Sequence, residues 1–213
     1  MATVAIGSAN SGIWADDANG IRQLVVRTGT IAPGTVADVF ASLSDPVYNS
    51  NNAVAFTGTL KIGVGDVVTL PVNNSVGIWS NDGGTLHMVA RQGQQAPGLA
   101  SGAVFASFGQ FVLPDQGGAS NMGGVVLLAN VSGKGVVSAS NQGIWAVDTS
   151  GKLQLVLRTG GSLNGKVITG LAFLTSATQE AGQTRSYSQS TGDLLVKCTF
   201  SDGSWKFVQV VFP

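Results

Sequence analysis

The sequence predicts an all-β fold, a β-propeller-like array of three four-stranded antiparallel repeats of about 65 residues each. Three observations predict it: a recurring Gly-Ile-Trp segment, a composition rich in glycine and poor in charge, and four strand-like segments in every repeat. The tryptophans of the recurring segment, Trp14, Trp79 and Trp145, lie 65 and 66 residues apart. A constant period of this kind is typical of a repeat architecture.

The composition favours strands and tight turns. Only 10% of the 213 residues are charged, against about 25% in an average soluble domain. Eleven basic and eleven acidic residues cancel and no basic run occurs, which argues against nucleic acid or an anionic membrane as a partner. No apolar run approaches the roughly 18 residues of a spanning helix, so we expect no membrane span.

Each repeat begins with a two-stranded ribbon. In the first repeat, residues 13–15 and 21–27 are strand-like, and the turn between them ends in Asn19-Gly20. Asn-Gly supplies the positive φ that a tight hairpin turn needs. Equivalent turns at residues 81–84 and 148–151 predict the same ribbon in the other two repeats.

A turn and two further strands complete each repeat. The turn is Pro-Gly at residues 33–34 and 97–98, and Asn-Gly at residues 164–165. Aromatic and branched residues suited to a pleated sheet follow it. The third strands are predicted near residues 39–43, 104–108 and 171–174, and the fourth strands at residues 53–60, 125–131 and 194–200.

We therefore expect a single repeat domain over residues 1–213. Its parts are repeat 1 at about 11–75, repeat 2 at about 76–141, repeat 3 at about 142–204 and a closing strand at 205–213. A lone fourth-type strand at residues 3–7 precedes the repeats. Since propellers typically have about four to eight blades, three alternatives stay open: a longer array, a homodimer that completes a six-bladed ring, or another stacking of the sheets.

Short motifs at the strand ends carry a family resemblance. Residues 49–56 read Asn-Ser-Asn-Asn-Ala-Val-Ala-Phe, residues 121–128 keep the Asn and Gly of Asn-x-x-Gly, and residues 199–204 read Thr-Phe-Ser-Asp-Gly-Ser. With Gly-Ile-Trp, this set resembles the tandem-repeat family of bacterial surface or secreted proteins with the NxxGxxAF motif, which often carry a C-terminal sorting anchor. The resemblance implies an exported, propeller-like module at the cell surface or outside the cell, and it carries no catalytic residues over.

Three arginines at equivalent positions, Arg27, Arg91 and Arg158, are the candidate ligand-binding residues. A ring of three guanidinium groups could hold a carboxylate or a phosphate by bidentate pairing. The alternative is that each ends a strand and bonds nearby turn carbonyls or stacks on a tryptophan. We favour the alternative, because a repeated residue normally serves the fold of its own repeat.

The residues for catalysis are sparse. The chain has one histidine, His87, one glutamate, Glu180, and one cysteine, Cys198, which we expect to be buried. Asp16 and Asp17 lack the twelve-residue calcium-loop pattern. We therefore predict no catalytic residue, no metal site and no cofactor.

Two classes of function remain. The first is a non-catalytic structural or recognition module that binds a protein or a glycan through variable loops such as residues 61–76 and 117–124. The second is a hydrolase or lyase that acts on polysaccharide at the propeller axis, and converging carboxylates in a concave pocket would favour it. The scarcity of Glu and His favours the first.

Overall fold

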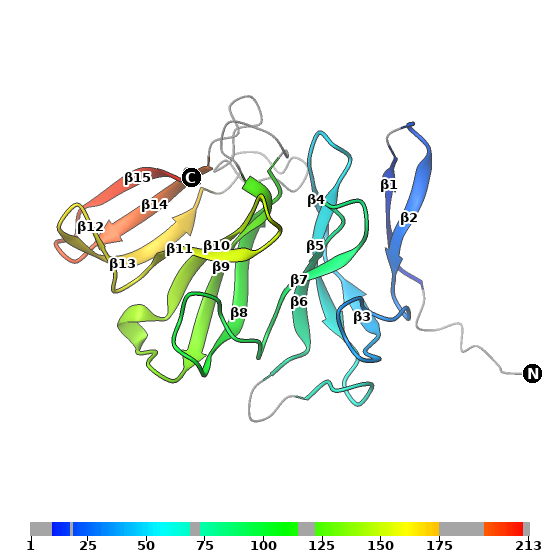
Figure 1. Cartoon of the computed structure of the whole chain (residues 1–213), viewed down its shortest axis with the longest axis horizontal. Coiled ribbons are helices and arrows are strands. Elements are labelled where there is room, and N and C mark those ends of the chain that lie inside the picture. Colours follow the sequence, from blue (N-terminus) through cyan, green and yellow to red (C-terminus); the bar gives the residue numbers. More distant parts are fainter. Residues whose placement is uncertain (1–9, 18, 69–72, 115–121, 175–193, 211–213) are drawn as a thin grey trace, which may run out of the picture.

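The computed structural model describes residues 10–17, 19–68, 73–114, 122–174 and 194–210. In these residues the chain is all-β with antiparallel sheets, and its one short 3₁₀ helix, η1, spans Ser138–Ser140. Figure 1 shows four sheets side by side in chain order, from the ribbon near the N-terminus to the sheet near the C-terminus. No helix in the described part of the chain is long and apolar enough to cross a membrane.

The four sheets use fifteen strands. The first sheet contains β1 (Gly12–Asp16) and β2 (Arg22–Arg27). The second contains β3 (Phe40–Leu43), β4 (Val47–Tyr48), β5 (Val54–Leu60), β6 (Val76–Ser80) and β7 (His87–Arg91). The third contains β8 (Ala103–Val112), β9 (Met122–Gly133), β10 (Gln142–Asp148) and β11 (Leu153–Arg158). The fourth contains β12 (Ser162–Leu163), β13 (Lys166–Phe173), β14 (Leu194–Phe200) and β15 (Trp205–Val210).

The sheets do not coincide with the sequence repeats, so three repeats give four sheets rather than three. The second sheet joins β3 and β5 of the first repeat to β6 and β7 of the second, and the third sheet is built in the same way. The reason is that the spacing of the tryptophans fixes the length of a sequence repeat but does not show which strand of the repeat begins a sheet. The predicted strand at residues 3–7 lies outside the described residues.

Each ribbon contains the same irregularity at the Ile-Trp step. The register of β1 with β2, of β6 with β7 and of β10 with β11 shifts between the isoleucine and the tryptophan. A β-bulge bends its strand and increases the local twist. Because successive residues of a strand point to opposite faces of a sheet, the isoleucine and the tryptophan of each ribbon lie on opposite faces.

Three hydrophobic clusters hold the four sheets together. In each cluster, the isoleucine side of one ribbon packs against the following sheet. Ile13 packs with Phe56 and Trp79, Ile78 packs with Leu127 and Trp145, and Ile144 packs with Val196 and Phe200. Cys198 is buried in the last of these clusters, as expected.

Trp79 and Trp145 are fully buried and make the same contacts. A Cβ added at Gly77 would lie 2.7 Å from the Trp79 ring, so the glycine makes room for the indole. The indole nitrogen of Trp79 donates to the carbonyl of Pro33 at 3.0 Å, and that of Trp145 donates to Pro97 at 2.9 Å. Both indoles therefore lie packed between neighbouring sheets, whereas Trp14 is 56% exposed.

We expect Trp79→Ala to lower the free energy of unfolding by about 3–5 kcal/mol, because it opens a cavity between the first two sheets. Trp79→Phe keeps an aromatic ring and loses the bond to Pro33, so a smaller loss should follow. Urea unfolding measures both values. Ile62→Ala, at an exposed site, is the control, and an unchanged midpoint for Trp79→Ala would contradict the role assigned to the indole.

Candidate cleft between the first two sheets

A cleft of about 590 Å³ opens between the β1–β2 ribbon and the second sheet. Its lining comes from the turn of the ribbon, from β2, from the loop that enters β5 and from the turn between β6 and β7. The polar residues of the lining are Asp16, Asp17, Gln23, Asn51, Asn52, Asn81, Asp82 and Thr85, and the larger apolar ones are Leu24, Val25 and Leu86.

The ribbon turn is held by its own aspartates. The Asp17 carboxylate accepts the backbone N–H groups of Asn19 and Ile21 at 2.9 and 3.0 Å. Asp16 forms an ion pair with Arg22 at 3.0 Å. The two Asp17 bonds are the local side-chain to backbone type that Asp favours in turns, and they fix Asn19 and Ile21 beside the cleft.

The loop before β5 is held by the Asn-x-x-Asn segment. Asn49 is buried, and its side-chain oxygen accepts the backbone N–H groups of Asn51 and Ala53. Its amide group donates to the carbonyl of Pro114 at 3.0 Å. Asn52 stands where the motif has glycine and has φ of 60°, which asparagine tolerates better than most residues. Asn52 also donates to the Asp17 carbonyl at 3.4 Å, which links the loop to the ribbon turn.

Two of the three carboxylates that line the cleft, those of Asp17 and Asp82, have pKa values shifted in opposite directions. Hydrogen bonds from the backbone of Ile21 and Asn19 lower the pKa of Asp17. Burial raises the pKa of Asp82, although the nearby His87 ring, 3.3 Å from the carboxylate, acts against that rise. At neutral pH the Asp17 side of the cleft is therefore anionic.

Sequence reasoning missed this cleft. It pointed instead to loops 61–76 and 117–124, and residues 117–121 lie outside the described part of the chain. The described part of the first loop is tied to the fold, since Val67 is buried and Asp66 pairs with Arg91. The sequence did contain one indication of the cleft. The turns at residues 16–20 and 81–84 each join the first strand of a ribbon to its second strand, so they lie at the same end of neighbouring sheets.

Arg91 is the only one of the three candidate arginines with a buried side chain, 7% exposed. Its guanidinium group contacts the carboxylates of Asp38 and Asp66, both at 2.9 Å, and its Nε donates to the carbonyl of Asn74. Burial raises the pKa of Asp38, while hydrogen bonds from Asp38 and then Arg91 lower the pKa of Asp66. Arg91 also lines a second cleft of about 610 Å³, where two carboxylates already neutralise its charge.

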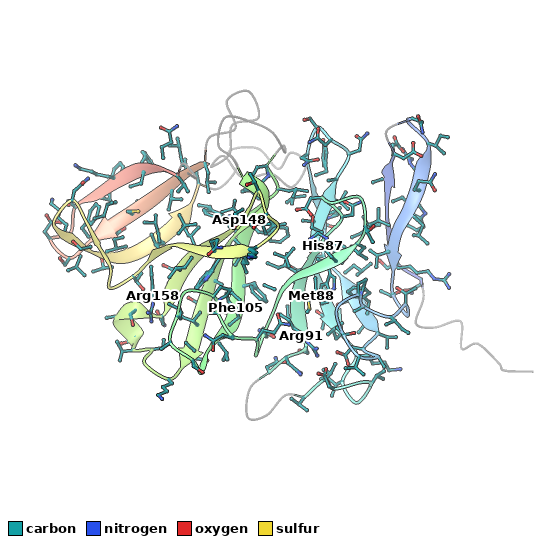
Figure 2. All side chains as sticks on the ribbon, in the orientation of Figure 1. His87, Met88, Arg91, Phe105, Asp148 and Arg158 are labelled. Atoms are coloured by element: carbon teal, nitrogen blue, oxygen red, sulfur yellow. The ribbon has the colours of Figure 1, made fainter. Side chains whose placement is uncertain are left out.

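The other two arginines lie on separate sheets. Arg158, at the end of β11, donates from Nε to the carbonyl of Ser140 at 2.7 Å, and Figure 2 shows it apart from Arg91, on the next sheet of the stack. Ser140 and Asn74 both stand five residues before the tryptophan of their ribbon, so the two bonds are equivalent. Arg27 is exposed at the end of β2, and its equivalent acceptor, residue 9, lies outside the described residues.

Of the residues considered for catalysis or metal binding, the structure describes His87 and Cys198 but not Glu180. His87 begins β7 and its ring contacts Asp82 and the carbonyl of Thr85. Burial raises the pKa of the Cys198 thiol, which makes it a poor nucleophile. Within the described ranges, no group of three His, Cys, Asp or Glu side chains could hold a metal ion. Glu180 lies outside those ranges.

Comparison with protein families identifies the family of this chain. The family model described as a family of unknown function, DUF7453, matches residues 2–211. The chain belongs to this family. Searches of curated proteins and of solved structures found no match for this DUF7453 protein.

We expect Arg91→Ala to lower the free energy of unfolding by about 3–5 kcal/mol at neutral pH, because it leaves the fully buried Asp38 carboxylate without its cation. The loss should shrink as the pH falls, because protonation removes the charge of Asp38. Urea unfolding at pH 7 and pH 4 measures both effects. Arg27→Ala is the matched control, since Arg27 is exposed at the equivalent position. An Arg91→Ala protein of unchanged stability that no longer binds an anion would identify a ligand site instead.

A second pair of variants tests how Asp38 is enclosed. Gly65 has φ of 63°, and a Cβ added there would lie 1.8 Å from the Asp38 carboxylate. Gly63 has φ of 77° with open space at the same point. Both changes to alanine cost the left-handed conformation, so Gly65→Ala should unfold at clearly lower temperature than Gly63→Ala. Equal melting temperatures would contradict this placement of the loop.

Proposed function

We propose that this protein is a non-catalytic recognition module of an exported bacterial surface protein, and that the cleft between the first two sheets binds a neutral glycan. The observation that carries the proposal is the lining of the cleft. Amide, hydroxyl and carboxylate groups converge there from three turns, beside the apolar side chains of Val25 and Leu86. Sugar hydroxyl groups both donate and accept hydrogen bonds, which amides and carboxylates match.

The charge of the cleft favours a neutral ligand over an anionic one. Asp16, Asp17 and Asp82 all line it, and a carboxylate group on a ligand would meet like charges there. Gln23, Asn51 and Thr85 are exposed and supply donors and acceptors without charge. A protein loop rich in Ser, Thr and Asn presents similar groups and is the second kind of ligand that fits.

Two observations support the proposed cell-surface location and array architecture of the module. The motifs around Gly-Ile-Trp and Asn-x-x-Gly resemble the bacterial surface family, and a composition low in charge and rich in small polar residues suits an exported protein. Successive antiparallel sheets stacked face to face, with strands shared between repeats, support a propeller-like array. Ring closure by a homodimer into six blades stays a prediction.

A polysaccharide hydrolase or lyase is the second candidate, and one observation favours it. Asp17 and Asp82 line the same cleft with pKa values shifted in opposite directions, as an acid and base pair requires. Binding remains the better interpretation because the carboxylates have structural partners. Asp17 holds two backbone N–H groups, and Asp82 contacts His87.

Calorimetric titration of the protein with neutral oligosaccharides, chosen from a glycan array, tests the proposal. We expect Gln23→Ala and Asn51→Ala to weaken binding at least about tenfold each, as expected for lost polar contacts. Gln110→Ala, at an exposed site on β8, is the control. Binding that survives both changes would rule out this cleft. Release of reducing sugar that Asp17→Asn abolishes would support the hydrolase.

A further inference from the structure

The three interfaces between sheets follow one rule. Every sheet has a tryptophan face, which carries Trp14, Trp79, Trp145 or Val208, and an isoleucine face, which carries Ile13, Ile78, Ile144 or Phe207. Val208 takes the tryptophan position because it pairs with Val196 as Trp79 pairs with Phe56. In each interface the isoleucine face of one sheet covers the tryptophan face of the next.

The first sheet leaves its tryptophan face uncovered by the described residues. Trp14 is 56% and Leu24 is 50% exposed, and the two residues pair across the ribbon. The equivalent pair in the second sheet, Trp79 and Met88, lies in an interface, and Trp79 is fully buried. The Trp14 ring also lies over its glycine, 2.9 Å from a Cβ added at Gly12, so this face already has the geometry of the buried ones.

The fourth sheet leaves its isoleucine face uncovered in the same way. Trp205 and Phe207 of β15 are 54% and 50% exposed, with their rings 5.2 Å apart. Leu195 of β14 and Val167 of β13 are exposed on the same sheet. The residue at the position of Phe207 in the second sheet is Ile78, which is fully buried. End units of repeat arrays normally carry a polar outer face, and contiguous exposed apolar residues indicate an interaction site.

We propose that the isoleucine face of the fourth sheet, around Phe207, docks on the tryptophan face of the first sheet, around Trp14, in a second copy of this chain. The two open faces are of the two kinds that cover each other three times within the chain. They also lie at opposite ends of the stack (Figure 1), so one copy cannot bring its own two faces together without a closed ring. The contact is head to tail, and it produces a closed oligomer or a filament according to the rotation between copies.

The docking rests on the array part of the proposed function and is independent of the glycan cleft. If two copies closed on each other, the ring would contain eight sheets, four from each chain, rather than the six blades that three sequence repeats per chain predict. Loss of glycan binding in a protein that still associates would therefore remove the proposed ligand and leave the docking in place.

Light scattering behind a sizing column, over a range of protein concentrations, tests the docking. We expect the unmodified protein to have a mass above that of one 21.6 kDa chain. Trp14→Asp and Phe207→Asp should each give the mass of a single chain, because each places a carboxylate in an apolar contact. Ile62→Asp, exposed and outside both faces, should associate as the unmodified protein does. Circular dichroism confirms that each variant is folded.

Mixing the two variants distinguishes head-to-tail docking from other contacts. Trp14→Asp has an intact Phe207 face and Phe207→Asp has an intact Trp14 face, so the mixture should form a pair through one contact, although neither variant associates alone. A mixture that stays monomeric would overturn the proposal, because it contains one intact face of each kind and head-to-tail docking must then form a pair. A contact of one face with itself would instead let the variant that keeps this face associate alone, which would also overturn the proposal. An unmodified protein that is monomeric at every concentration would also overturn it.

Discussion

The fold depends on one repeated contact, a tryptophan ring that lies across glycines and donates to the carbonyl of a Pro-Gly turn. Trp79 covers Gly77 and Gly58 and bonds Pro33, which belongs to the preceding repeat. Because the indole and its acceptor come from different repeats, no single repeat can satisfy its own tryptophan. The contact therefore couples neighbouring repeats, and it explains why the glycine, the tryptophan and the proline recur together.

The sequence predicted most strands and the pairing inside each ribbon, but it did not predict how strands are divided among sheets. Alternating residues and Asn-Gly turns act locally, so residues 53–60 and 194–200 could be placed as strands before the structure was known. The pairing of β5 with β6 joins two repeats through a loop of fifteen residues, 61–75, and no local pattern records it. The offset between repeats and sheets follows from that pairing.

The candidate site shows the same limit. The three arginines were visible because they recur, yet the partners of Arg91 are Asp38 and Asp66, which do not recur at equivalent positions and could not be paired with it from spacing. The cleft combines Asp17, Asn51 and Asn81, whose turns meet only after β5 has paired with β6 and the ribbon has packed on the second sheet. Asp17 recurs three residues after each tryptophan, as Asp82 and Asp148, whereas Asn51 and Asn81 do not recur, so the cleft combines a repeated turn residue with residues particular to one repeat.

The last sheet shows that the tryptophan and its acceptor turn change together. Val208 occupies the tryptophan position of β15, and the turn that would cover an indole is reduced to Asn164-Gly165, a two-residue hairpin between β12 and β13. The valine side chain has no N–H group and needs no carbonyl acceptor. A tight turn with φ of 53° at Asn164 therefore stands in place of the longer Pro-Gly turn. The fourth sheet instead packs Val196, Cys198 and Phe200 against the isoleucine face of the third sheet. At the other end Trp14 keeps the indole of a buried position without an acceptor turn among the described residues, which sets the two ends of the stack apart chemically.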